Sequence, residues 1–153
     1  MKLDNPRLEV RYVDDPESLK ALIEALGSVA VIGLDAERAS GFRYSHRAYL
    51  IQIAIQDVAI YLIDPEGFEG DQWAKELGSA MAKTTWILHA ATQDLPCLAE
   101  LGIRPTSLID TELAARLGGL ERFGLASLAE VLLEMELAKE HSAADWSQRP
   151  LPE

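Results

Sequence analysis

Residues 29–37 read Val-Ala-Val-Ile-Gly-Leu-Asp-Ala-Glu, and this stretch decides most of what the sequence says about the fold. Its nearly unbroken apolar run, which lasts until Asp35, is typical of a central strand covered on both faces. Asp35 and Glu37 stand two residues apart, so on a strand they point to the same face, about 6.6 Å apart along the chain. Two carboxylates at this spacing can bind hard cations such as Mg²⁺ or Mn²⁺. Taken alone, such a pair is more often simply solvated at the end of a strand, and both alternatives stay open.

The segments around this strand predict a mixed α/β sheet with an antiparallel hairpin. A helix is expected to begin after Asp15, a favourable N-cap followed by a proline, and to end at Gly27. The turn Gln56-Asp57 separates two further strands, which therefore pair as a hairpin. Three strands in a row exclude an alternating doubly wound fold. The elements expected after the first helix are strands at 29–37, 49–55 and 58–63, a helix near 73–81, a strand at 86–89, and helices at about 92–101, 110–117 and 125–136.

The composition is that of an ordinary globular protein. The 153 residues suit one domain, and 48% apolar with 25% charged residues indicate a folded rather than a disordered chain. The single cysteine, Cys97, excludes an internal disulfide framework and a Cys-based zinc cluster, and it indicates a reducing compartment. The sequence has no apolar run long enough to span a membrane and no secretory-signal stretch near Met1. We therefore expect a cytoplasmic protein with no membrane partner.

The net charge argues against nucleic-acid binding except at one loop. Lys and Arg number 14 against 25 Asp and Glu, which gives −11, so the chain as a whole should repel a phosphate backbone. The loop at 38–48 contains no acidic residue and four basic ones: Arg38, Arg43, His46 and Arg47. Such a loop can bind phosphates beside Asp35 and Glu37, with Phe42 and Tyr44 available for base stacking. The alternative is a solvated loop whose aromatic side chains pack onto the sheet.

Two more carboxylates stand at the starts of predicted helices. Asp94 follows the strand at 86–89 and lies in the first turn of the next helix, where the helix dipole favours an ionised carboxylate. It could also simply cap that helix, and for Asp110 the cap is the favoured interpretation. His89 ends the same strand and is more often a core or capping residue, although near a phosphate it could donate a hydrogen bond. Three other residues are predicted to pack in the core: Trp73, Trp86 and Cys97.

Six short segments stand in a specific order along the chain: Ile32–Glu37, Leu50–Ala54, Ala59–Pro65, His89–Leu95, Ile109–Thr111 and Ala144–Leu151. This ordered set resembles the DEDD superfamily of 3′–5′ exonucleases, and specifically the ribonuclease D family. The resemblance runs from about residue 11 to the end of the sequence. The long, arginine-containing loop after Glu37 is more similar to ribonuclease D than to its DNA-directed relatives.

The resemblance implies a ribonuclease H-like fold and two-metal-ion hydrolysis of RNA from the 3′ end, which releases nucleoside 5′-monophosphates. It implies that Asp35 bridges two Mg²⁺ or Mn²⁺ ions, that Glu37 binds one of them, and that Asp94 completes the shell of the second. It also implies an RNA partner such as the 3′ end of a transfer-RNA precursor. The expected substrate-binding residues are Arg38, Arg43, His46, Arg47, Gln52, His89 and Gln93.

One part of the family pattern is missing from the sequence. The third motif, a tyrosine followed four residues later by a fourth carboxylate, should come just after Arg149-Pro150-Leu151, but the sequence ends at Glu153. We therefore expect residues 1–153 to be an exonuclease domain that is incomplete at its C-terminal end, poorly active alone, and followed by a helical domain in the full-length protein. Two alternatives stay open: a non-catalytic module on the same fold that binds RNA or a protein, and a DNA-directed 3′–5′ exonuclease.

Overall fold

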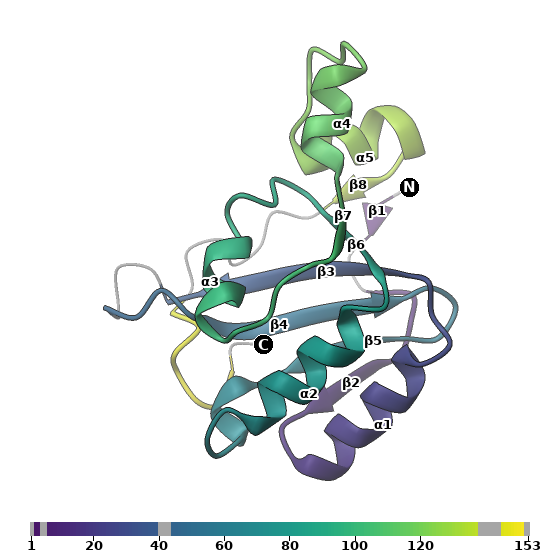
Figure 1. Ribbon diagram of the computed structural model, residues 1–153. Helices are drawn as coiled ribbons and strands as arrows, with labels where there is room; N and C mark the ends of the chain where they lie inside the picture. Colours follow the sequence, from purple (N-terminus) through teal and green to yellow (C-terminus); the bar gives the residue numbers. More distant parts are fainter. Residues whose placement is uncertain (1, 4–5, 40–43, 138–144, 152–153) are drawn as a thin grey trace.

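The computed structural model describes residues 2–3, 6–39, 44–137 and 145–151 (Figure 1). Its largest feature is a six-stranded sheet, whose members are β2 (Val10–Val13), β3 (Val31–Arg38), β4 (Ala48–Ile55), β5 (Ala59–Ile63), β6 (Thr85–Leu88) and β7 (Ser107–Asp110). Their spatial order is β2-β5-β4-β3-β6-β7, and β4 runs antiparallel to both of its neighbours while the other pairs are parallel. The predicted mixed α/β fold with an antiparallel hairpin is therefore confirmed.

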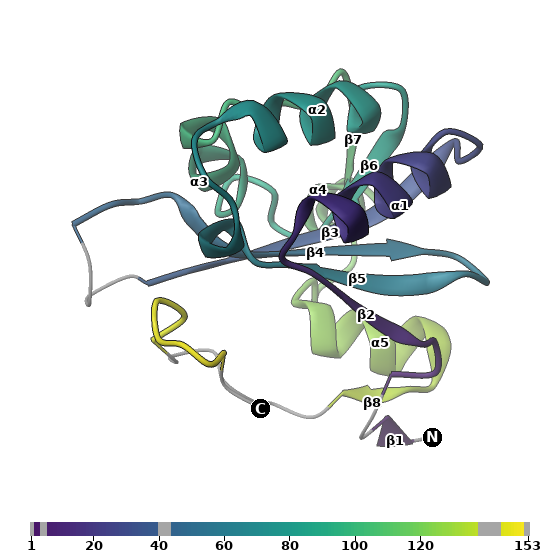
Figure 2. The ribbon, with the colours of Figure 1, turned by 90° about the horizontal axis from the view of Figure 1, so that it is seen from below.

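Helices lie on both sides of this sheet. They are α1 (Pro16–Leu26), α2 (Gln72–Met81), α3 (Leu95–Glu100), α4 (Thr111–Leu117) and α5 (Leu125–Leu133), with a short 3-10 helix at Pro65–Gly67. Figure 2 shows α1 and α2 over one face, while α5 lies on the opposite side near the two-residue pair of β1 (Lys2–Leu3) and β8 (Glu136–Leu137). None of the helices in the described part of the chain is long and apolar enough to cross a membrane.

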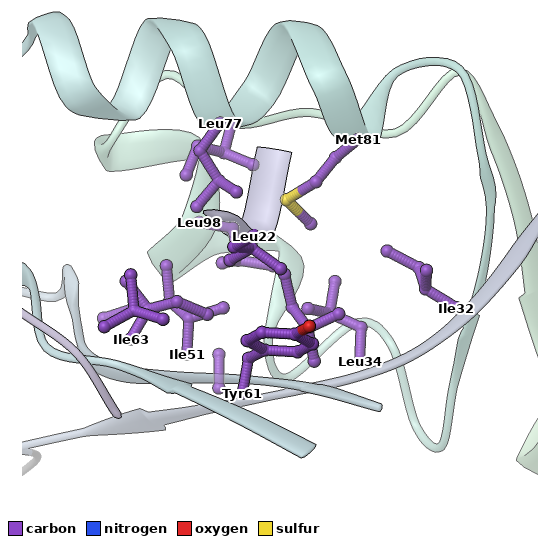
Figure 3. Close-up of a cluster of buried hydrophobic side chains, with 14 of the residues drawn as sticks. Leu22, Ile32, Leu34, Ile51, Tyr61, Ile63, Leu77, Met81 and Leu98 are labelled. Carbon is purple, nitrogen blue, oxygen red and sulfur yellow. The ribbon is translucent and has the colours of Figure 1, made fainter. Parts of the chain in front are cut away.

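Strand β3 alternates between the two faces of the sheet. Ile32 and Leu34 are buried under α1 and α2, whereas Asp35 and Glu37 lie on the opposite face, called the outer face below. Figure 3 shows Ile32 and Leu34 in the apolar cluster between the sheet and the helices, together with Met81 of α2. Burying a large apolar side chain of this kind contributes about 1.5–3 kcal/mol. The inner face therefore supplies most of the packing, and the outer face is free to carry polar groups.

Helix α1 begins where the sequence predicts. The Asp15 carboxylate accepts hydrogen bonds from the backbone N–H groups of Glu17 and Ser18, both at 2.8 Å, and the Ser18 hydroxyl accepts one from the backbone N–H of Asp15. This capping box satisfies N–H groups that have no partner within the helix. The helix ends at Gly27 as predicted. The core positions predicted from the sequence are also buried: Trp73, Trp86 and Cys97.

The structure differs from the sequence prediction in the short strands β1, β2, β7 and β8 and at the ends of two helices. The pattern does not predict β2 and β7, because these short outer strands lack clear apolar alternation; Tyr12 is 65% exposed and Ile109 is 47% exposed. The helix expected at about 92–101 begins only at Leu95, because Pro96 fits its first turn and the residues just before it form tight turns. The last predicted helix ends at Leu133 instead of 136, since the next residue adopts a left-handed conformation.

Candidate active site

The outer face collects acidic side chains near the carboxyl end of β3. Asp35 and Glu37 share this face, as their spacing predicts. The register of β3 against β4 shifts between Glu37 and Arg38. An irregularity of this kind bends a strand and re-aims the side chains beside it. Asp35 and Glu37 thus lie on the last part of β3, just before the chain enters the basic loop at 38–48.

Asp35 is held by the neighbouring strand. It pairs directly with Gln52 of β4, and Gln52 Nε2 donates a hydrogen bond to Asp35 Oδ2 at 3.2 Å. The sequence analysis places Gln52 among the substrate-binding residues, and the structure gives its amide a contact with a predicted metal ligand. Gln52 can therefore orient the Asp35 carboxylate.

Asp94 reaches the same region from the other side of β3. Strand β6 lies parallel beside β3, and a turn at 89–94 leads from the end of β6 to the start of α3. Asp94 takes the N-cap position of α3 and is only 7% exposed, yet its side chain makes no hydrogen bond to the helix. Side-chain capping, the alternative considered from the sequence, is therefore not observed. Asp94 is a buried carboxylate to which no group in the described residues donates a hydrogen bond.

The three carboxylates act on one another electrostatically. Burial raises the pKa of Asp94 to about 7, and the negative charge of Asp35 is the next-largest cause, with a smaller contribution from Glu37. Burial also raises the pKa of Asp35 and of Glu37, and the Asp35 charge adds to the increase at Glu37. Like charges raise one another's pKa when they lie near each other. Asp35, Glu37 and Asp94 are therefore near enough to act on one another through their charges, although Asp35 itself is exposed on the outer face.

Arg38 partly balances this negative charge. Its guanidinium lowers the pKa of both Glu37 and Asp94, although burial and repulsion between carboxylates outweigh it. Arg38 makes no ion pair at salt-bridge distance with any described residue. Among the basic residues predicted to bind phosphate, Arg38 is placed beside the carboxylates and keeps its charge available.

The donor set fits a hard divalent cation. Three carboxylates, with no cysteine or histidine among them, are the ligands that Mg²⁺ and Mn²⁺ prefer. Their raised pKa values mark carboxylates that lack a sufficient counter-charge. Across residues 6–39, 44–137 and 145–151, no three His, Cys, Asp or Glu side chains form a ready metal-binding group.

The rest of the basic loop has other contacts. The Arg47 guanidinium forms an ion pair with Glu66 and lies 5.1 Å from the centre of the Tyr49 ring. His46 is exposed. Tyr44 is fully exposed, so it does not pack onto the sheet. Positions 40–43 of the predicted loop lie outside the described residues, and they include Phe42 and Arg43.

His89 and Gln93 lie in the turn that leads to Asp94. His89 Nδ1 is 3.0 Å from the Thr111 hydroxyl, which donates to a backbone carbonyl at the end of β6. His89 Nε2 is 3.9 Å from a carboxylate oxygen of Glu112. His89 is thus bound to the start of α4, which agrees with the structural interpretation of this histidine. Gln93 is exposed.

One residue that the sequence analysis did not single out holds the C-terminal segment on the outer face. Arg149 forms an ion pair with Asp64 and donates a hydrogen bond to the backbone carbonyl of Tyr49 at 3.2 Å. Figure 2 shows this yellow segment on the side of the sheet opposite α1 and α2. A cavity of about 610 Å³ is lined by this segment and the sheet, and it extends to Gln52, the partner of Asp35. The only sequence signal was the block Ala144–Leu151, in which Arg149 lies.

Comparison with known proteins bears on the family and the fold of the chain. A family model described as 3′–5′ exonuclease matches residues 10–153. Ribonuclease D of Desulfotalea psychrophila is 34% identical over 145 residues, which cover 92% of this chain and 38% of that protein. The crystal structure of Escherichia coli RNase D, an exoribonuclease involved in structured RNA processing, is 30% identical with a TM-score of 0.83, covering 95% of this chain and 39% of that one.

A second solved structure, of a protein from Bifidobacterium adolescentis, is 43% identical with a TM-score of 0.86 and covers 99% of this chain and 37% of that one. This chain therefore spans less than two fifths of the length of these three relatives. The sheet order and helix placement are those of the RNase D exonuclease fold, which is ribonuclease H-like.

Proposed function

Because this chain belongs to the 3′–5′ exonuclease family of the DEDD superfamily, with ribonuclease D among its relatives, we propose that it removes nucleotides from RNA 3′ ends. The proposed reaction is hydrolysis of the terminal phosphodiester with two Mg²⁺ or Mn²⁺ ions, releasing nucleoside 5′-monophosphates. What supports this proposal is the raised pKa of Asp35, Glu37 and Asp94, with the charge of Asp35 contributing to the increase at both Glu37 and Asp94.

Each carboxylate has a proposed role in this reaction. Asp35 lies on the central strand and would bridge two ions, Glu37 would bind one of them, and Asp94 would complete the shell of the other. Ions held there would supply an activated water and would balance the negative charge on the attacking and leaving oxygens. The chain itself supplies the orientation: the Gln52 amide holds Asp35, and the turn before α3 places Asp94.

The proposed RNA contacts surround this site. Arg38 is the first candidate for a phosphate contact, because its charge already acts on Glu37 and Asp94. Arg47 would have to leave Glu66 before it could bind a phosphate. The other proposed contacts are Arg43, His46, Gln52, His89 and Gln93. A phosphate beside Arg38 would gain a charge-assisted hydrogen bond while its scissile bond lies at the carboxylates.

The whole protein is proposed to be longer and to act in the cytoplasm on RNA such as transfer-RNA precursors. The relatives are more than twice the length of this chain. The ribonuclease D resemblance implies a tyrosine and a fourth carboxylate after Arg149-Pro150-Leu151, and the complete site is proposed to need both. A missing anionic ligand weakens metal binding, so we expect residues 1–153 to bind Mn²⁺ more weakly than the full-length protein and to cleave RNA poorly.

The proposal is tested with 5′-labelled RNA and DNA strands of the same sequence and full-length protein in Mg²⁺ or Mn²⁺. The expected result is a ladder of RNA products shortened from the 3′ end, and loss of the ladder in Asp35→Asn with an unchanged circular dichroism spectrum. Binding of RNA without shortening would support the non-catalytic module, and preferred shortening of DNA would support a DNA-directed exonuclease. Either result would overturn the proposed function.

A further inference from the structure

Asp110 makes more contacts than a helix cap requires. Its Oδ1 accepts hydrogen bonds from the backbone N–H groups of Glu112 at 2.9 Å and Leu113 at 3.2 Å, so the predicted cap of α4 is confirmed. The same carboxylate also accepts two backbone N–H groups from outside its own helix. Ala90 N–H donates to Oδ1 at 3.1 Å, and Ala91 N–H donates to Oδ2 at 2.9 Å.

The sheet brings Asp110 to this position. Strands β6 and β7 run parallel, and Asp110, the last residue of β7, pairs with Leu88, the last residue of β6. The turn that follows β6 therefore passes directly beside the Asp110 carboxylate. Thr111 adds a second link, because its hydroxyl donates to the Leu88 carbonyl at 3.1 Å.

The turn that Asp110 holds is strained. Ala90 has a φ of 55°, a left-handed conformation that is unfavourable for a residue other than glycine. Such a conformation persists only where surrounding contacts stabilise it. The two N–H groups that Asp110 accepts belong to this residue and the next, so the Asp110 carboxylate stabilises the turn at its strained point.

The same turn fixes the backbone of Asp94. The carbonyl of Ala91 accepts hydrogen bonds from the backbone N–H groups of Asp94 at 3.1 Å and Leu95 at 2.9 Å. The backbone N–H of Ala91 donates to the Asp110 carboxylate, and the backbone C=O of Ala91 accepts from Asp94 and Leu95 at the start of α3. A continuous chain of hydrogen bonds therefore runs from Asp110 through Ala91 to Asp94.

From this chain of contacts we infer that Asp110 is a positioning residue: its carboxylate holds the Ala90–Ala91 turn and thereby places Asp94 beside Asp35 and Glu37. The inference rests on the proposed function in one respect, because the benefit of placing Asp94 is metal binding. Groups that hold a metal ligand from outside the coordination shell contribute about 10- to 100-fold to metal affinity.

The test compares the same substitution at two helix caps. Serine caps a helix about as well as aspartate, so Asp110→Ser keeps a cap for α4 but its single hydroxyl cannot reach across to the turn. Asp15→Ser is the matched control, because the Asp15 carboxylate accepts hydrogen bonds only at the start of α1. Amide exchange of individual residues by NMR and Mn²⁺ binding by electron paramagnetic resonance are measured on the full-length protein.

The expected result has two parts. Asp110→Ser speeds amide exchange at Ala91, Asp94 and Leu95 and weakens Mn²⁺ binding about tenfold. Asp15→Ser changes neither measurement. Unchanged exchange at Asp94 and Leu95, or unchanged Mn²⁺ affinity, in Asp110→Ser would overturn the inference.

If Asp110→Ser folds poorly, a second variant tests the same inference. Asp110→Asn retains an oxygen for three of the four N–H donors but turns an amide NH₂ toward the N–H of Ala91, so its exchange and Mn²⁺ affinity should fall between those of wild type and Asp110→Ser. Equality of Asp110→Asn with wild type in both measurements contradicts the inference. Wild-type protein that binds no Mn²⁺ overturns the proposed function instead, while amide exchange still decides whether Asp110 holds the turn.

Discussion

The junctions β6–α3 and β7–α4 share one local pattern, a strand that leads to an aspartate at a helix N-cap, but the two aspartates have opposite environments. Burial would raise the pKa of Asp110, but four backbone N–H donors, from Leu113, Ala91, Glu112 and Ala90, hold it below its ordinary value. Asp94 is 7% exposed, its side chain accepts no hydrogen bond from the described residues, and burial with nearby carboxylates raises its pKa to about 7. A carboxylate that accepts four backbone N–H groups stabilises the fold, whereas one that accepts no hydrogen bond from the described residues keeps its oxygens available to a cation.

The largest expected effect is on the rate of RNA cleavage, and it distinguishes the proposed metal ligand Asp94 from a helix cap. Asp94→Asn in the full-length protein should lower the rate of RNA 3′-end shortening by at least about 100-fold, because loss of a direct ligand costs more than loss of a group outside the shell. Asp15→Asn, at the cap of α1, should leave the rate unchanged. The measurement is a single-turnover digestion of 5′-labelled RNA. An Asp94→Asn variant within threefold of wild type would remove Asp94 from the metal site.

The pH dependence of metal binding is the next effect. Asp94 must lose its proton before it binds a cation, and its pKa in the folded chain is about 7. Mn²⁺ affinity should therefore fall by up to about tenfold for each pH unit below 7 and level off above it. Titrations of the wild-type chain at fixed ionic strength from pH 5.5 to 8.5 measure this. Asp94→Asn should show a shallower slope, and identical slopes in both proteins would contradict the assignment.

Ionisation of Asp94 should lower the free energy of unfolding, whereas ionisation of Asp110 should raise it. The folded-state pKa of Asp94 lies above its ordinary value of 3.8, so its ionisation destabilises the fold as pH rises from about 4 to 7. Without metal at pH 8, Asp94→Asn should raise the free energy of unfolding by about 1–2 kcal/mol, allowing for solvent screening. Asp110 has a lowered pKa, so it stabilises the fold above pH 3.8 and loses this effect on acidification.

Asp110→Ser should therefore lower the free energy of unfolding by about 1 kcal/mol at pH 7, and by less at pH 3. Urea unfolding of both variants and wild type at these pH values, with a chelator present, measures the difference. Destabilisation by Asp94→Asn at pH 8 would show that the Asp94 carboxylate has a stabilising partner.

The smallest effect concerns the two arginines that flank the basic loop. Arg38 acts on Glu37 and Asp94, whereas Arg47 is paired with Glu66. Arg38→Ala should weaken RNA binding several-fold and reduce the slope of its salt dependence by about one phosphate contact. Arg47→Ala should have a smaller effect, since its charge is already partly neutralised. Fluorescence anisotropy with labelled RNA at several salt concentrations measures both, and a larger effect of Arg47→Ala would reverse this order.

The sequence predicted the parts of the site that depend on local spacing. The period of a strand places Asp35 and Glu37 on one face, and the N-cap pattern places Asp110 at the start of α4; the structure confirms both. The sequence did not predict β2 and β7, because short strands at the edges of the sheet take their stability from the neighbouring strand. For the same reason the contact between Asp110 and the turn after β6 could not be predicted, since it depends on the parallel pairing of β6 with β7.

By itself the sequence determined the inner face of the sheet and the caps of α1 and α4, because each follows from the period and chemistry of neighbouring residues. The three carboxylates were singled out by the resemblance to the ribonuclease D family, since local spacing alone left their roles open. Only the tertiary structure decided that Asp110 accepts backbone hydrogen bonds from a distant segment, while Asp94 accepts none from the described residues. That outcome depends on desolvation and on donors from distant segments, and both arise when β6, β7 and β3 are packed side by side. The ionisation of Asp94 is therefore a property of the folded chain, while its chemical suitability as a ligand is a property of the sequence.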